Sequence, residues 1–197
     1  MVETESHVLA ENQRGKWESL SPGIWRPCSG VHLENPRLLA ARTLFDWPRW
    51  LDASFLYDRN GSRLFDEISR LPEYYLTRTE TSLLERHAAE SVRQSTASCL
   101  VELGAGYSKK TGHLLSQMTA AGGRVTYVPI DVSAAALEGS RDRLRIDFPD
   151  IRFAGLNATY EKGLEAIDPS RPKFLAFLGS SIGNFMRADL TRFLEVL

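Results

Sequence analysis

The stretch Val-Glu-Leu-Gly-Ala-Gly at residues 101–106 decides the fold of this chain. It closes an apolar run that begins at Cys99, and a polar turn followed by a helical pattern comes after it. The order is therefore a strand, a glycine turn and the N-terminus of a helix. Because glycine has no Cβ, such a turn lets backbone N–H groups approach a polar or anionic ligand closely.

Apolar runs alternate with helical patterns through the C-terminal half of the chain. This alternation predicts βαβ units, and therefore an α/β fold with a parallel sheet. The predicted strands are residues 99–103, 125–130, 151–156 and 174–178, and the predicted helices are residues 111–118, 133–147 and 187–197.

The N-terminal half lacks this alternation. Proline and glycine interrupt residues 1–36, which predicts a loop-rich arm. The dipeptide Asn60-Gly61 predicts a turn, after which Ser62 would cap a helix. We therefore divide the chain into an N-terminal arm and helical segment, residues 1–95, and a ligand-binding core, residues 96–197.

A further helix is predicted in the N-terminal segment, from about residue 78 to residue 92. Thr77 and Glu80 have the spacing of a capping box, in which a hydroxyl and a carboxylate satisfy backbone N–H groups reciprocally. Leu83 and Leu84 would give this helix its buried face.

The composition excludes several classes of protein. Lys and Arg number 24 against 25 Asp and Glu, so we expect neither nucleic acid nor an anionic membrane surface as a partner. No apolar run reaches the length of a membrane span, and the first residues do not resemble a signal peptide. The two cysteines form no CxxC pair, and we expect no metal site. We therefore expect a reduced, cytoplasmic monomer.

Polar or glycine residues follow each predicted strand of the core, namely Gly104, Asp131, Thr159 and Asn184. In a parallel sheet, ligands bind beyond the carboxyl ends of the strands, where the strand order reverses. These four positions therefore predict one ligand site along one edge of the sheet. A tight connection without a ligand remains an alternative for the glycine turn taken alone.

The residues around the turn favour S-adenosylmethionine over a dinucleotide. A dinucleotide fingerprint needs a third glycine where this chain has Lys109. Glu102 and Asp131 instead end two neighbouring strands, and the carboxylate of Asp131 offers two acceptors to two ribose hydroxyls. Asp131 could also be an acid favoured at a helix N-terminus. Lys110 would either meet the cofactor's carboxylate or remain solvated.

Four motifs occur in register. These motifs resemble those of the histidine-specific, S-adenosylmethionine-dependent methyltransferases, which make trimethylhistidine in ergothioneine biosynthesis. The resemblance implies a Rossmann-like class I methyltransferase sheet with helices on both faces. The motifs are FLYDRNGSRLFDEI with LPEYYLTRTE (residues 55–68 and 71–80), VELGAG (101–106), YVPIDVS (127–133) and FLGSSIGN (177–184).

The resemblance also implies roles for individual residues. Tyr57, Tyr74 and Asn184 match residues of the pocket for L-histidine, in which the asparagine binds the amino-acid head group. Gly104, Lys110 and Asp131 match contacts to the cofactor.

The chain departs from the family pattern after the third strand. Family members often carry Gly-Asp-Phe there, with the acid on the adenine amino group, whereas this chain has Ala158-Thr159-Tyr160. We therefore expect Thr159 and Tyr160 at the adenine, with a hydroxyl in place of the charge.

The family's domain also continues beyond the position matching Leu197, with further strands and a substrate lobe. We therefore expect a sheet truncated after its fourth strand. The activity implied is methylation of the α-amino group of L-histidine to the trimethylated betaine hercynine. The alternatives are a non-catalytic remnant that binds S-adenosylmethionine, and a methyltransferase for another small amine. None of the four histidines lies in a motif, so no catalytic base is predicted.

Overall fold

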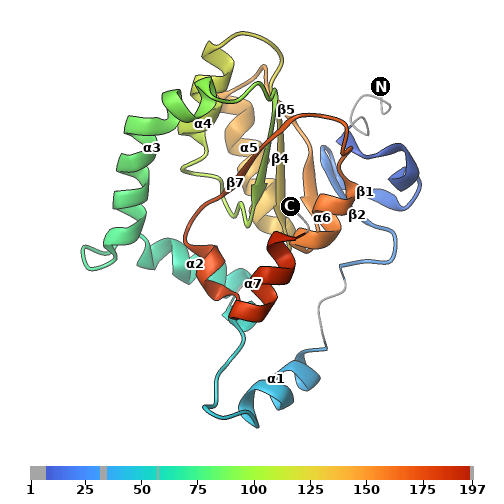
Figure 1. The fold of residues 1–197 in the computed structure, drawn as a ribbon, viewed down its shortest axis with the longest axis vertical. Helices are drawn as coiled ribbons and strands as arrows, with labels where there is room; N and C mark the ends of the chain where they lie inside the picture. The colour runs from blue at the N-terminus through green and yellow to red at the C-terminus, as the bar shows by residue number, and fades with distance from the viewer. Residues whose placement is uncertain (1–7, 32–34, 57, 196–197) are drawn as a thin grey trace.

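The computed structural model describes residues 8–31, 35–56 and 58–195 (Figure 1). Its centre is one mostly parallel sheet with the strand order β1-β2-β6-β4-β3-β7, and β5 pairs with β4 beside β6. The strands are β1 (Trp17–Ser21), β2 (Ile24–Pro27), β3 (Cys99–Leu103), β4 (Thr126–Asp131), β5 (Arg152–Phe153), β6 (Gly155–Asn157) and β7 (Lys173–Phe177).

The strand order reverses at β3. From β3 the chain moves outward through β4 to β6, and it then returns to place β7 on the other side of β3. All these pairs are parallel, with Leu103 opposite Ile130 on one side and Phe177 on the other. The carboxyl ends of β3 and β7 therefore flank the crevice in which such sheets bind their ligands.

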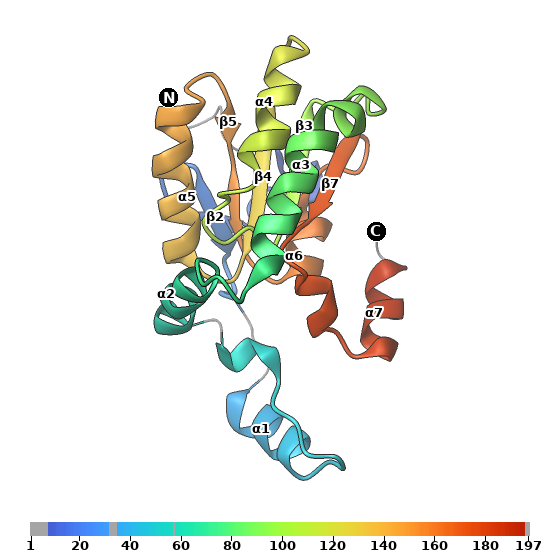
Figure 2. The ribbon, with the colours of Figure 1, turned by 90° about the vertical axis from the view of Figure 1, so that its left-hand side faces the viewer.

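Helices cover both faces of the sheet, as the family resemblance implies (Figures 1 and 2). One face carries α3 (Tyr75–Arg93), α4 (Gly112–Ala120) and α5 (Ala134–Asp147), and the other carries α6 (Tyr160–Ala166) and α7 (Arg187–Leu194). Alternate residues of β3 point to opposite faces of the sheet and join two different hydrophobic clusters. Leu100 packs on the face covered by α3, α4 and α5, and Val101 packs on the face covered by α6 and α7. Both side chains are fully buried, which explains why this strand is apolar in sequence.

The prediction of a loop-rich arm was wrong for residues 17–27. Strands β1 and β2 form an antiparallel hairpin, and β2 extends the sheet by pairing in parallel with β6. Gly23 turns the hairpin at φ +74°, and Ile24 is fully buried where β2 meets β6. The glycine that indicated a loop therefore belongs to a hairpin turn.

The N-terminal helices begin earlier than predicted. Helix α2 (Arg59–Ile68) is capped by Asp58, whose side chain accepts a hydrogen bond from the Gly61 N–H at 2.6 Å. Asn60-Gly61 thus lies inside the helix, and Ser62 is not its cap. Helix α3 begins at Tyr75 without a side-chain cap, so the predicted capping box of Thr77 and Glu80 was also wrong.

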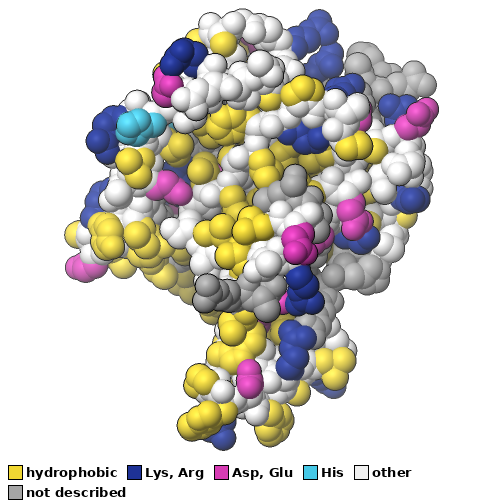
Figure 3. Space-filling model, viewed as in Figure 1, with side chains coloured by type: hydrophobic (Ala, Val, Ile, Leu, Met, Phe, Trp, Pro, Cys, Tyr) yellow, Lys and Arg dark blue, Asp and Glu magenta, His cyan; other side chains and the backbone are white. Residues whose placement is uncertain are grey.

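Helix α1 (Pro36–Leu44) projects away from the sheet, capped by Asn35. Hydrophobic side chains gather over this projection in Figure 3, and Phe45 and Trp47 are 92% and 85% exposed. Within the described residues, no helix combines the length and the apolar character needed to cross a membrane.

Candidate functional site

The glycine turn after β3 is bare backbone packed against one tyrosine. Gly104 and Gly106 have φ angles of +65° and +50°, which glycine adopts without strain. A Cβ on Gly104 would lie 2.7 Å from the hydroxyl oxygen of Tyr160, whereas a Cβ on Gly106 would meet nothing within 4 Å. Only glycine therefore fits at position 104 with Tyr160 in place.

Asp131 holds the turn from the end of β4. Its Oδ2 accepts from the Gly106 N–H and its Oδ1 from the Ser133 N–H, both at 2.8 Å. Burial raises the pKa of Asp131, and these backbone hydrogen bonds oppose the rise. A carboxylate has about four lone-pair sites, so acceptor capacity remains for a donor on a ligand, which is what the ribose interpretation uses.

Glu102 points beneath the turn into a polar network that the sequence did not reveal. Its carboxylate is buried and accepts from the Thr111 hydroxyl at 2.6 Å and from the Tyr127 hydroxyl. Ser108 links Tyr127 to Ser140, with both oxygen–oxygen distances at 2.6 Å. Burial raises the pKa of Glu102 to about 7 despite the hydrogen bonds from Thr111 and Tyr127. Through Thr111, Tyr127 and Ser108, this network connects the residues after the glycine turn to the buried core.

Lys110 is paired with a carboxylate from the N-terminal segment. Its Nζ forms an ion pair with Glu80 on α3, and the second oxygen of Glu80 accepts from the Gly179 N–H at 2.7 Å. The neighbouring Lys109 pairs in the same way with Asp66 on α2. Glu80, which the sequence predicted to be part of a capping box, thus contacts both the turn after β3 and the turn after β7.

Two groups of predicted residues meet at one small cavity of about 10 Å³, which has room for about one water molecule. Tyr74, expected at the substrate, and Lys110, expected at the cofactor, both line it, although they come from different halves of the chain. Tyr74 is partly buried and packs edge-on against Phe65, with ring centroids 5.9 Å apart. The remaining lining residues are Phe65, Leu76, Thr77, Glu80, Gly179 and Ser180.

Asn184 ends the short 3-10 helix η4 (Ser181–Asn184) that follows the β7 turn, and its side chain is exposed. It thus lies four residues beyond the cavity-lining Ser180 on the same connection. Tyr57, the third expected substrate residue, lies outside the described residues.

Thr159 and Tyr160 lie at the start of α6. Thr159 is the N-cap of this helix, and its hydroxyl accepts from the Lys162 N–H at 3.4 Å. Tyr160 packs against Phe177, with ring centroids 5.4 Å apart, and its hydroxyl reaches Gly104. Tyr160 thus lies at the glycine turn, and a role for either residue at the adenine stays a prediction.

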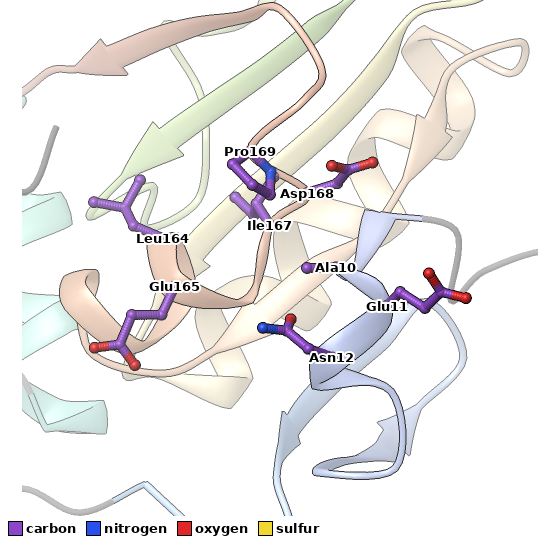
Figure 4. A pocket seen from close by; sticks show the side chains of 8 residues that line it. All are labelled: Ala10, Glu11, Asn12, Leu164, Glu165, Ile167, Asp168 and Pro169. Atoms are coloured by element: carbon purple, nitrogen blue, oxygen red, sulfur yellow. The ribbon is translucent and has the colours of Figure 1, made fainter.

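A wider depression lies away from this site (Figure 4). Helix α6 starts beyond the carboxyl end of β6, and the residues after it lead back to the beginning of β7. The depression is therefore near the amino ends of the strands, where parallel sheets do not place their ligands. It is lined by Ala10, Glu11, Asn12, Leu164, Glu165, Ile167, Asp168 and Pro169.

Comparison with known families identifies the chain. Residues 37–197 match the model of a family described as histidine-specific methyltransferase, SAM-dependent. The chain belongs to this family. The match includes α2, α3 and the strands from β3 to β7, which are the elements that carry the glycine turn, Lys110 and the cavity.

Named relatives of the chain come from bacteria and fungi. Histidine N-alpha-methyltransferase of Mycolicibacterium smegmatis is 39% identical over 76% of this chain and 47% of its own length. Ergothioneine biosynthesis protein 1 of Neurospora crassa is 34% identical over 98% of this chain and 22% of its own. The 4-dimethylallyltryptophan N-methyltransferase easF of Claviceps fusiformis is 32% identical over 75% of this chain and 43% of its own. The chain thus spans less than half the length of each relative.

The residues of the histidine-specific methyltransferase site fit S-adenosylmethionine, the cofactor in the family's description. Gly106 has open space where a Cβ would lie, so a ligand can approach its backbone, and the carboxylate of Asp131 keeps acceptor capacity beside it. Lys110 provides a cation next to the same turn. Its ammonium has three donors, so pairing with Glu80 leaves it able to bind a carboxylate as well.

Proposed function

We propose that this chain binds S-adenosylmethionine and L-histidine together and methylates the histidine α-amino group, with trimethylhistidine (hercynine) as the final product of an ergothioneine pathway. The observation that carries the proposal is the cavity shared by Tyr74 and Lys110. There, a tyrosine matching the family's substrate residues lies beside a lysine matching its cofactor contacts.

The sequence identities to named relatives favour histidine over other amines as the substrate. The mycobacterial relative named for histidine is 39% identical, whereas the Claviceps relative named for 4-dimethylallyltryptophan is 32% identical over a similar share of this chain.

The chemistry asks the protein mainly for alignment. When bound, S-adenosylmethionine supplies an electrophilic methyl group on its sulfonium. The protein's task is to hold the amine lone pair in line with that methyl group, which is catalysis by proximity and orientation. Asn184 is suited to this, because its amide carbonyl accepts from an amine and its NH₂ donates to a carboxylate. Tyr74 would pack over the substrate and exclude water.

A methylation assay tests this proposal. The protein is incubated with S-adenosylmethionine and either L-histidine or 4-dimethylallyltryptophan, and products are separated by mass spectrometry. We expect mono-, di- and trimethylated histidine and no methylated indole substrate. In Asn184→Ala, the histidine KM should rise by at least about tenfold, the expected loss of one or two hydrogen bonds to charged groups. Histidine kinetics unchanged in that variant would refute the assignment.

A further inference from the structure

Glu80 occupies an unusual position between two turns. It lies on α3, and each of its oxygens has one partner: Lys110 after the glycine turn, and the backbone N–H of Gly179 after β7. The side chains of Glu80 and Lys110 are 25% and 21% exposed. A pair at this depth interacts more strongly than an ion pair in open solvent.

The β7 turn held by Glu80 has a special backbone. Gly179 and Ser180 both have positive φ angles, +80° and +61°. The backbone of a non-glycine residue such as serine rarely adopts this region. A carboxylate on the Gly179 N–H fixes the point at which the chain leaves β7. The same chain then forms η4, which ends at Asn184.

The neighbouring ion pair offers a contrast. Lys109 and Asp66 also join a helix of the N-terminal segment to the glycine turn. Lys109 is 50% exposed, and Asp66 shares its carboxylate with Arg70, which lies just beyond the end of the same helix. This pair reaches the glycine turn only, whereas Glu80 reaches both turns.

We propose that Glu80 is a positioning residue that couples cofactor binding to substrate binding. The glycine turn carries Gly104 and Lys110, which match cofactor contacts, and the β7 turn leads to Asn184, which matches a substrate contact. Because the two carboxylate oxygens move together, a shift of Lys110 toward a cofactor carboxylate is transmitted to Gly179. This inference rests on the proposed function, since the coupling joins the two ligands named there.

Hydrogen exchange tests the contact itself, without any ligand. We expect the Gly179 amide of the full chain to be protected, and its exchange to accelerate by at least about tenfold in Glu80→Ala, the loss expected for a hydrogen bond to a charged group. Asp66→Asn is the matched control and should leave Gly179 unchanged. Unfolding curves show whether both variants remain folded. Unaltered Gly179 exchange in a folded Glu80→Ala protein would overturn the inference.

Calorimetry tests the coupling. L-histidine is titrated with and without saturating S-adenosylhomocysteine, and the ratio of the two affinities is compared between variants. A glutamine at position 80 has one acceptor oxygen and can serve only one of the two donors. We expect a ratio of at least about fivefold in the unaltered chain and in Asp66→Asn, and a ratio close to one in Glu80→Gln.

The two proposals fail separately. An equal ratio in Glu80→Gln and the unaltered chain refutes the coupling while the proposed function stands. If the unaltered chain binds no S-adenosylhomocysteine, both the proposed function and the coupling fail.

Discussion

Replacing Gly104 by alanine tests the geometry of the glycine turn, and Gly106→Ala is its matched control. Both positions have positive φ, so an alanine at either costs about 1–2 kcal/mol of stability. At position 104 the new Cβ also meets the Tyr160 hydroxyl at 2.7 Å, whereas position 106 is open. Relieving such an overlap costs roughly 1–3 kcal/mol more. We therefore expect Gly104→Ala to be the more destabilising change in urea unfolding.

Tyr160→Phe supplies the second half of this test. Without the hydroxyl, the nearest ring atom to the Gly104 Cβ is the Tyr160 Cζ position at 3.5 Å, an ordinary contact. The extra cost of Gly104→Ala should therefore largely disappear when it is measured in the Tyr160→Phe background, as a double-mutant cycle. Equal costs for the two glycine variants, or an extra cost that survives the loss of the hydroxyl, would refute the described packing of Tyr160 on the turn.

Three further changes probe other parts of the account. Because burial raises the pKa of Glu102 from 4.5 to about 7, its contribution to stability is fully present below pH 4.5 and is lost as the pH rises through 7; unfolding free energies measured across this range should fall by on the order of 3 kcal/mol relative to Glu102→Gln, and parallel pH profiles would contradict the burial of this carboxyl group. Asp131→Asn retains one acceptor oxygen for the N–H groups of Gly106 and Ser133, so chemical denaturation should show a loss of about 1–3 kcal/mol, and unchanged stability would argue against this contact. Ile24→Ala removes a fully buried side chain from β2 and should cost about 2–5 kcal/mol in the same denaturation experiment; a loss below 1 kcal/mol, the scale of surface substitutions, would show that the hairpin is not part of the folded sheet.

The core of the fold could be predicted because its strands are buried on both faces. A strand such as β3, with each of its five residues buried, leaves a continuous apolar run in the sequence. Ser133 was likewise recognisable as a helix cap, and its hydroxyl does accept from the Ala136 N–H. Such signals are local, so one sequence is enough to find them.

The β1–β2 hairpin and the contacts of Glu80 with Lys110 and Gly179 could not be predicted, because their partners lie far apart in the sequence. Strand β2 has only four residues, and its partner β6 lies far along the chain, so neither periodicity nor spacing reveals the pairing. Glu80 contacts Lys110, which is 30 residues away in the sequence, and Gly179, which is 99 residues away. A local explanation, the capping box with Thr77, was available for the same residue and was wrong. Contacts of this kind depend on the strand order, which brings the two turns together only after folding.

The central claim is that the glycine turn and the β7 connection form one site for two ligands. Its most direct test is calorimetric titration of S-adenosylhomocysteine into the protein, followed by L-histidine into the saturated complex. The account predicts that both bind, and that Asn184→Ala weakens only the histidine step. Binding of S-adenosylhomocysteine with no detectable binding of histidine to the complex would contradict it.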